Sequence, residues 1–183
     1  MRVREAELRR GEHGLEPARS GWFILNAADA PWIERPGRGF YVEFEGLHGA
    51  ADFSQLGINI NVLAPGEPIG MYHYENDQED FLVLSGEALL LVEGQERALR
   101  RWDLVHCPAG TAHIIIGAGD RPCVVLCAGA RTPRGAGWGA YTIDDTAIRH
   151  GVGVTEQTPD AEVAYARFGA STVTGSRPEL LPE

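Results

Sequence analysis

The sequence lacks most of what a disulfide-bonded, membrane-spanning or nucleic-acid-binding protein would need. Its cysteines number only 3 and form no Cys-x-x-Cys pair, so neither a disulfide framework nor a thiolate zinc site is predicted. Acidic residues exceed basic ones, and the net charge of -10 argues against nucleic acid or an anionic membrane as a partner. No apolar run is long enough to span a bilayer, and the first residues lack the apolar core of a secretion signal. We therefore expect a soluble, cytoplasmic protein.

What the sequence does contain is enough apolar material for one folded domain. Its 183 residues, 44% of them hydrophobic, can bury a sizeable core but are too few for two full domains. The charged, Gly- and Pro-containing residues 1–20 predict an amino-terminal arm. Residues 21–130 are predicted to form a β-barrel domain. Residues 131–183 are predicted to form a loop and a helical segment that packs on the barrel and ends in a tail.

Short apolar runs separated by glycine or proline turns predict strands. Such runs, at spacings of roughly 8–12 residues, are typical of an all-β barrel or sandwich. Several runs are apolar at both odd and even positions, so one face should fill a barrel and the other should meet a second sheet or another subunit. For this reason we expect a homodimer. The predicted strands are residues 22–25, 39–44, 58–63, 81–84, 88–92, 104–105, 113–116 and 123–127.

Two short helices are predicted after the last of these strands, beyond a Gly-rich loop over residues 132–139. The first runs through His150, is capped by Asp144 or Asp145 and ends at Gly151. The second has Thr158 as its cap and Pro159 at its first position, and ends before Gly169.

The residues that can carry chemistry lie in two short segments. His73 and Glu75 point to the same side of a strand, because the pleat repeats every two residues. Glu79 lies across a short turn, at the start of the next predicted strand. His113 follows a tight Pro-Gly turn, at the start of another. Several strands can therefore converge on one metal ion.

The spacing of these segments resembles that of the cupin superfamily, whose two signatures span the metal-binding strands of a barrel. The first signature is matched by His73, Glu79 and Gly86, and the second by Pro108, Gly110 and His113. The resemblance implies a cupin-type double-stranded β-helix, or jelly-roll, barrel. It also implies that His73, Glu79 and His113 are metal ligands, with Glu75 supplying a carboxylate oxygen.

The sequence departs from the cupin signatures at three positions. Gly66 comes one residue early, and Trp102 stands where the second signature usually has glycine. Glu75 stands where the first signature usually has its second histidine, and this change alters the ligand set. Two histidines and two carboxylates around a divalent cation are formally neutral, which weakens the attraction for an anionic substrate. The set favours Mn or Fe, and Zn or Ni is possible.

Each candidate residue could instead have a purely structural role. Glu75 belongs to an acidic turn of a kind that is usually just solvated. His113 could be a core histidine with its hydrogen bonds satisfied. If only three of the four side chains bind metal, two histidines and one carboxylate resemble the site of non-haem iron oxygenases. His106 could line the barrel and support the ligands or carry a proton.

These patterns lead to two functional hypotheses. The first is a metal-dependent enzyme, an oxygenase or an isomerase or lyase, that acts on a small, largely uncharged organic molecule. Its catalytic candidates are Glu75, as a general base, and His106. The second is a non-catalytic cupin that binds a small ligand or keeps a structural metal. Strand parity places Phe81, Val83, Ile115 and Met71 beside the predicted ligands, which favours a partly apolar cavity.

Overall fold

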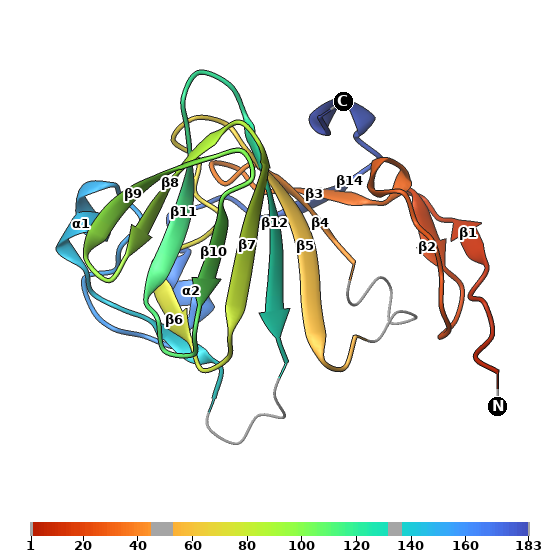
Figure 1. The fold of residues 1–183 in the computed structure, drawn as a ribbon, viewed down its shortest axis with the longest axis horizontal. Coiled ribbons are helices and arrows are strands. Elements are labelled where there is room, and N and C mark those ends of the chain that lie inside the picture. Colours follow the sequence, from red (N-terminus) through yellow and green to blue (C-terminus); the bar gives the residue numbers. More distant parts are fainter. Residues whose placement is uncertain (1, 45–52, 132–136, 183) are drawn as a thin grey trace.

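Two antiparallel sheets face each other and enclose the core in the computed structural model, which describes residues 2–44, 53–131 and 137–182 (Figure 1). In spatial order, the seven-stranded sheet contains β10 (Leu104–Cys107), β7 (Glu79–Ser85), β12 (Cys123–Ala130), β5 (Leu56–Leu63), β4 (Phe40–Glu43), β3 (Trp32–Glu34) and β14 (Thr172–Thr174). The five-stranded sheet contains β13 (Gly139–Tyr141), β6 (His73–Glu75), β11 (His113–Ala118), β8 (Glu87–Val92) and β9 (Gln95–Arg100). From β5 to β12 the chain passes back and forth between the sheets. This path confirms the predicted all-β, cupin-type double-stranded β-helix.

The barrel interior is filled by alternate residues of strands from both sheets. Inward-facing side chains of β7 and β12 meet those of β8 and β11, as strand pleating requires. All three cysteines are buried and free, and they belong to this core. The interior cluster comprises Leu63, Phe81, Val83, Ala88, Leu90, Leu99, Cys107, Ile115, Cys123, Val125 and Cys127.

The outer faces of both sheets are covered by the chain's own terminal segments. On the five-stranded sheet, Ile114 and Ile116 of β11 pack against Ala147 and Val152. On the seven-stranded sheet, a second outer cluster centres on Trp32 and includes residues from both ends of the chain. Because these segments cover the outer faces, the strands can be apolar at both odd and even positions without a second subunit. The expected homodimer stays a prediction.

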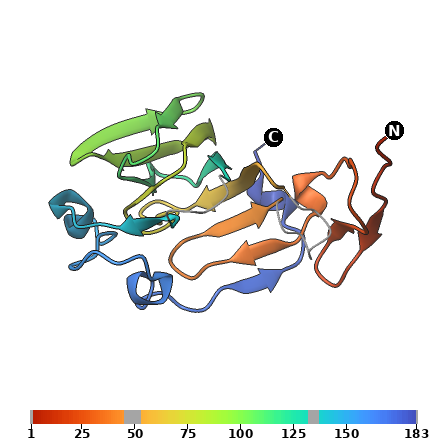
Figure 2. The ribbon, with the colours of Figure 1, turned by 90° about the horizontal axis from the view of Figure 1, so that it is seen from below.

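The terminal segments are more ordered than their composition indicated. Residues 1–20 contain a hairpin of β1 (Leu8–Arg10) and β2 (Leu15–Pro17), in which Arg9 pairs with Glu16 at 3.0 Å. The strand predicted at residues 22–25 was wrong, because only Trp22 forms a bridge, to Glu5. The predicted tail instead supplies β14, which lies alongside β3 (Figure 2). That pairing joins segments about 140 residues apart, which local patterns do not reveal.

The helices are few and short. The predicted first helix is confirmed as α1 (Asp145–Arg149), in which the Asp144 side chain accepts a hydrogen bond from the Ala147 amide. The second, α2 (Ala161–Ala164), starts later than predicted because Asp160 rather than Thr158 is its cap. Two 3-10 turns, η1 (Ala27–Asp29) and η3 (Pro178–Leu180), complete the described elements. Most of the loop predicted at residues 132–139 lies outside the described residues. No described helix has the length and apolar character needed to cross a membrane.

Candidate metal centre

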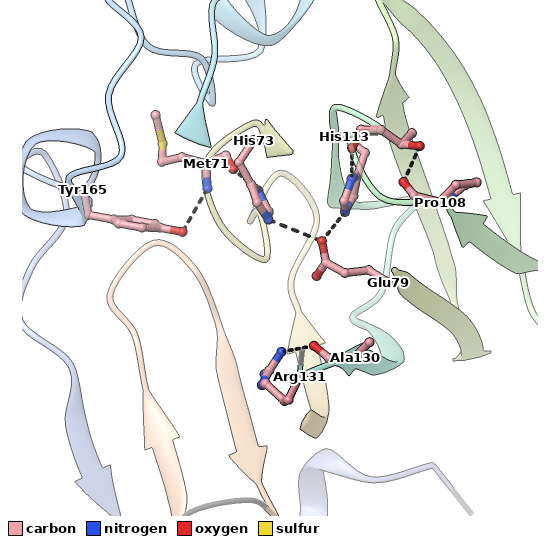
Figure 3. Close-up of polar contacts among 9 residues, drawn as sticks. Met71, His73, Glu79, Pro108, His113, Ala130, Arg131 and Tyr165 are labelled. Atoms are coloured by element: carbon pink, nitrogen blue, oxygen red, sulfur yellow. Dashed lines mark hydrogen bonds and ion pairs between the residues drawn. The ribbon is translucent and has the colours of Figure 1, made fainter. Parts of the chain in front are cut away.

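Three of the four predicted ligands converge at one end of the barrel. His73 begins β6 and His113 begins β11, and the two residues stand directly opposite each other in that strand pair. Glu79 begins β7 in the facing sheet, and its carboxylate lies between the two imidazole rings (Figure 3). The site therefore joins the two sheets through side chains at the ends of three strands.

The three side chains are close enough to share one ion. The Glu79 Oε2 atom lies 3.7 Å from His73 Nε2 and 3.4 Å from His113 Nε2. One potential ligand atom from each residue falls within 4.8 Å of the others. The two imidazole centroids are 5.2 Å apart, and the Phe81 ring packs edge-on against His113 with centroids 5.1 Å apart.

Backbone carbonyl groups fix the tautomer of both histidines. His73 Nδ1 lies 2.7 Å from the Met71 carbonyl oxygen, and His113 Nδ1 lies 2.9 Å from the Thr111 carbonyl oxygen. A carbonyl oxygen only accepts hydrogen bonds, so in each neutral ring the Nδ1 atom must carry the proton. The Nε2 lone pairs are thus directed at the shared point. Orientation of a ligating imidazole by its other nitrogen is the arrangement expected of a metal site.

A tight turn positions His113. The Thr111 amide donates to the Pro108 carbonyl at 3.1 Å, which closes a β-turn with Gly110 at its third position. Gly110 has φ 86, a left-handed conformation that glycine adopts at little cost. The Gly110 amide then donates to the Glu75 carbonyl at 2.7 Å. The Pro-x-Gly-x-x-His signature therefore ties the β11 turn to the strand that carries His73.

Burial controls the charge of the three side chains. Desolvation, followed by the nearby His113, lowers the pKa of His73 to about 4. Desolvation also lowers the pKa of His113. For Glu79, desolvation and then the negative charge of Glu75 raise the pKa to about 8. Without a cation, the site at neutral pH consists of two neutral imidazoles and a mostly protonated carboxyl group.

The donor set fits a divalent transition metal. Glu79 Oε2 and His113 Nε2 are buried and have no hydrogen-bond partner among the described residues. Leaving a buried polar atom unpaired costs about 1–3 kcal/mol, so an atom of this kind at a convergent site indicates a missing partner. Two imidazole nitrogens and one carboxylate oxygen are ligands that Mn, Fe, Ni and Zn all accept. The cluster is thus compatible with a metal site, and its geometry does not select one metal.

Glu75 does not join this cluster. It ends β6 on the same side as His73, as predicted, but the group of mutually close ligand atoms contains only His73, Glu79 and His113. Its charge still reaches the site, because it contributes to the raised pKa of Glu79. A ligand role for Glu75 stays a prediction.

His106 lies on the outside of the barrel instead of lining it. Its neighbour Cys107 is buried in the core, so strand alternation turns the His106 side chain outward. The side chain is 54% exposed, and its Nδ1 atom lies 2.6 Å from Asp80 Oδ1. The predicted contact with the ligands is therefore replaced by a surface ion pair.

A pocket of about 210 Å³ opens onto the three candidate ligands. Phe81 and Ile115 line it as strand parity predicted, whereas Met71 and Val83 are buried in the neighbouring core clusters. Sequence reasoning missed four polar lining residues, which are Arg35, Arg38, Asn59 and Tyr165. The Arg-Pro-Gly-Arg segment, a turn flanked by two arginines, was a signal for the first two. Nothing local pointed to Tyr165, whose hydroxyl accepts a hydrogen bond from the Met71 amide at 3.2 Å (Figure 3).

Solved structures with a similar fold include proteins of several kinds. A protein from Acidithiobacillus ferrooxidans with a suggested sugar phosphate isomerase activity is 28% identical, over 52% of this chain and 62% of that one, with a TM-score of 0.45. DMSP lyase DddQ from Ruegeria pomeroyi is 26% identical, over 52% of this chain and 48% of the lyase, with a TM-score of 0.44. An RmlC-like cupin family protein from Methanocaldococcus jannaschii is 23% identical, over 42% of this chain and 71% of that one, with a TM-score of 0.40.

These likenesses are partial, and the chain spans less than two thirds of the Acidithiobacillus and Ruegeria proteins. They assign no substrate. No curated protein sequence matches this chain. A family model does match: residues 59–129 correspond to the Cupin domain. This range runs from β5 to β12 and contains His73, Glu79 and His113. Residues 59–129 of this chain are therefore similar to the Cupin domain, and they fold as the double-stranded β-helix described above.

Proposed function

We propose that this protein is a metal-dependent enzyme that acts on a small organic molecule bound in the barrel pocket. One observation carries the proposal. The Nε2 atoms of His73 and His113 and the Glu79 carboxylate converge on a single point in the wall of a pocket large enough for a small molecule. A structural ion would need no such pocket beside it.

Three protein ligands favour a catalytic metal over a closed structural one. A four-coordinate ion keeps one open position with this set, and a six-coordinate ion keeps three. A bound divalent ion would supply a Lewis acid at a substrate oxygen, and iron would also permit oxygen chemistry. We favour Mn or Fe because of the mixed nitrogen and oxygen ligands, with Zn or Ni as the other candidates.

The protein's own groups orient and enclose the reacting molecule. Ile69, Phe81 and Ile115 present apolar surface that excludes water from the wall of the pocket. Glu75 lies outside the ligand cluster, and we propose it as the general base of an isomerase or lyase reaction. Glu75→Gln should then lower kcat and leave metal content unchanged. Loss of metal would instead make Glu75 a ligand.

The reaction class can be tested with reconstituted protein. Metal-free protein is loaded separately with Fe²⁺ and Mn²⁺, and oxygen consumption and product formation are followed over a panel of small organic substrates. Metal-dependent turnover that is lost in His113→Ala and Glu79→Gln supports the enzyme. Turnover that requires both Fe²⁺ and oxygen identifies an oxygenase. Turnover that Mn²⁺ supports in the absence of oxygen identifies an isomerase or lyase.

The matched control is His13→Ala. His13 lies on the amino-terminal hairpin, and its one ion-pair neighbour among the described residues is Glu12, at 4.0 Å. This variant should keep full metal content and turnover. If a ligand binds saturably but no metal supports turnover, the hypothesis of a non-catalytic cupin is correct and the enzyme hypothesis is wrong.

A further inference from the structure

Two arginines line the metal pocket without a carboxylate partner. Arg35 is buried, with 8% of its surface exposed, and Arg38 is half-buried. Neither takes part in any ion pair within the described residues. Taking a charged group out of water without an opposite charge is costly, so buried charges in proteins are normally paired. The pocket therefore holds two positive charges whose counter-charge the described chain does not supply.

A single β-turn holds the two arginines together. The Arg38 amide donates to the Arg35 carbonyl at 2.8 Å, with Pro36 and Gly37 at the two central positions. Gly37 has φ 74, the conformation that a type II turn requires there. The Arg35 Nη2 atom also donates to the Arg38 carbonyl at 3.1 Å. The backbone thus forces two like charges side by side.

Apart from Arg38, the groups that contact the Arg35 guanidinium are neutral. Its Nη1 atom donates to the Ile69 carbonyl at 3.0 Å, and its Nη2 atom donates to Asn61 Oδ1 at 2.6 Å. Its guanidinium lies over the Tyr41 ring, 4.3 Å from the centroid. Burial and the adjacent Arg38 lower the pKa of Arg35 to about 10, which leaves it charged at neutral pH. Arg35 is thereby a fixed cation with only neutral acceptors.

Arg38 is held by packing and not by hydrogen bonds. Its guanidinium lies 4.4 Å from the Tyr165 centroid and 5.2 Å from the Phe168 centroid. No described residue accepts a hydrogen bond from its side chain. The Nε atoms of Arg38 and Arg35 are both buried and unpaired. An oriented guanidinium with unused donors beside a pocket is the arrangement that binds an oxyanion.

We propose that Arg35 and Arg38 form the anion-binding subsite of this pocket, and that the molecule bound there is a small organic carboxylate. A carboxylate is favoured over a phosphate because both terminal nitrogens of Arg35 already bond to protein oxygens, so Arg38 supplies most of the unused donors. One guanidinium group presents a two-pronged fork that matches the two oxygens of a carboxylate. The same pocket also exposes His73, Glu79 and His113, so a second oxygen group of the ligand reaches the candidate metal centre. The assignment of that second contact rests on the proposed function.

This subsite changes the ligand expected from the sequence, which was a largely uncharged molecule. That expectation assumed a formally neutral centre with two carboxylates. The structure gathers only one carboxylate with two imidazoles, so a divalent ion there would keep a net positive charge. Two arginines add to that positive potential.

The test is calorimetry of succinate binding to metal-free and to Mn²⁺-loaded protein. Succinamide is the uncharged analogue for comparison, and glycerol 3-phosphate tests whether the subsite prefers a phosphate. Succinate should bind the metal-free protein, and Arg38→Gln should weaken this binding at least tenfold, because the variant loses the charge and the fork of N–H donors. Arg97→Gln is the control, because Arg97 is exposed and its side chain, within the described part of the chain, bonds only to its neighbours Gln95 and Glu96. It should bind succinate as the wild type does.

Several results would overturn the subsite. Equal binding of succinamide and succinate would do so, as would unchanged binding in Arg38→Gln or no saturable succinate binding at all. If glycerol 3-phosphate binds more tightly than succinate and this binding depends on Arg38, the subsite binds a phosphate and not a carboxylate. The two proposals fail separately. Arg38-dependent succinate binding in a protein that takes up no metal refutes only the metal centre, and metal uptake without succinate binding refutes only the subsite.

Discussion

Metal binding at neutral pH should release close to one proton, and Glu79 should be its source. Metal coordination requires the ionised carboxylate. In the metal-free protein, burial and the nearby Glu75 raise the pKa of Glu79 to about 8. At pH 7 about 90% of the molecules then carry a proton on Glu79, which the metal must displace. The pKa of His73 is lowered to about 4, so this histidine is already neutral and releases nothing.

The expected pH profile follows from these two values. Proton release should be about one per metal at pH 6, about one half at pH 8 and about one tenth at pH 9. The apparent affinity should rise about tenfold from pH 6 to pH 7 and level off above pH 8. Calorimetry in buffers with different ionisation enthalpies measures the protons released. Mn²⁺ is the metal to use, because water bound to zinc can itself lose a proton near pH 7.

Two results would refute this account of the site. Absence of proton release at pH 7 would mean that Glu79 is ionised in the metal-free protein, so that burial does not dominate its pKa. Release of two protons would mean that a histidine is protonated as well. In Glu79→Gln, the small amount of metal that still binds should release no proton at pH 7.

Three further predictions concern stability, measured by urea or thermal unfolding of metal-free protein. Glu79→Gln should raise the free energy of unfolding at pH 9 by about 4 kcal/mol and change it little near pH 5. The reason is that a carboxyl group whose folded pKa is raised to about 8 destabilises the fold only as the pH rises above its unfolded pKa. A difference that does not depend on pH would contradict this. Trp102→Gly should stabilise the protein by about 0.5–1 kcal/mol. Trp102 has φ 75 and is 63% exposed, so glycine would remove backbone strain and lose little packing. Lower stability would show that the contact between Trp102 and Arg101 contributes more than the strain costs. Gly86→Ala should lower the free energy of unfolding by about 2 kcal/mol or more, because Gly86 has φ 73 and an added Cβ would lie 2.7 Å from Cys123 Cα. Gly66→Ala should lower it by only about 1 kcal/mol, because Gly66 has φ 85 but open space around the added Cβ. Equal losses would show that small shifts relieve the close contact at Gly86.

The parts of the fold that could be predicted are those that depend on local pattern. Strand parity and turn spacing allowed His73, Glu79 and His113 to face one interior point, and the resemblance to cupins implied that they do. The same alternation placed Phe81 and Ile115 beside these residues. The helix cap at Asp144 followed from the preference of aspartate for that position. Strand parity, turns and helix caps are each set by residues that are neighbours in the sequence.

The parts that could not be predicted depend on distant contacts or on close local competition. Arg35 faces the pocket because it bonds to Asn61 and Ile69, which are 26 and 34 residues away. The helix α2 begins after Asp160 because two adjacent capping residues competed, and the Thr158 hydroxyl instead accepts from the Asp160 amide. For Glu75, parity gave the correct side of β6 but not whether its carboxylate reaches the other ligands. That depends on side-chain conformation, which parity does not fix.

The most direct test of the central claim is a crystal structure of the Mn²⁺-loaded protein with an anomalous difference map. One metal peak should lie within bonding distance of His73 Nε2, His113 Nε2 and a Glu79 carboxylate oxygen, with both Nδ1 atoms still bonded to the Met71 and Thr111 carbonyls. A peak elsewhere, or no peak at this point in protein saturated with the metal, would contradict the claim that these three side chains form the metal centre.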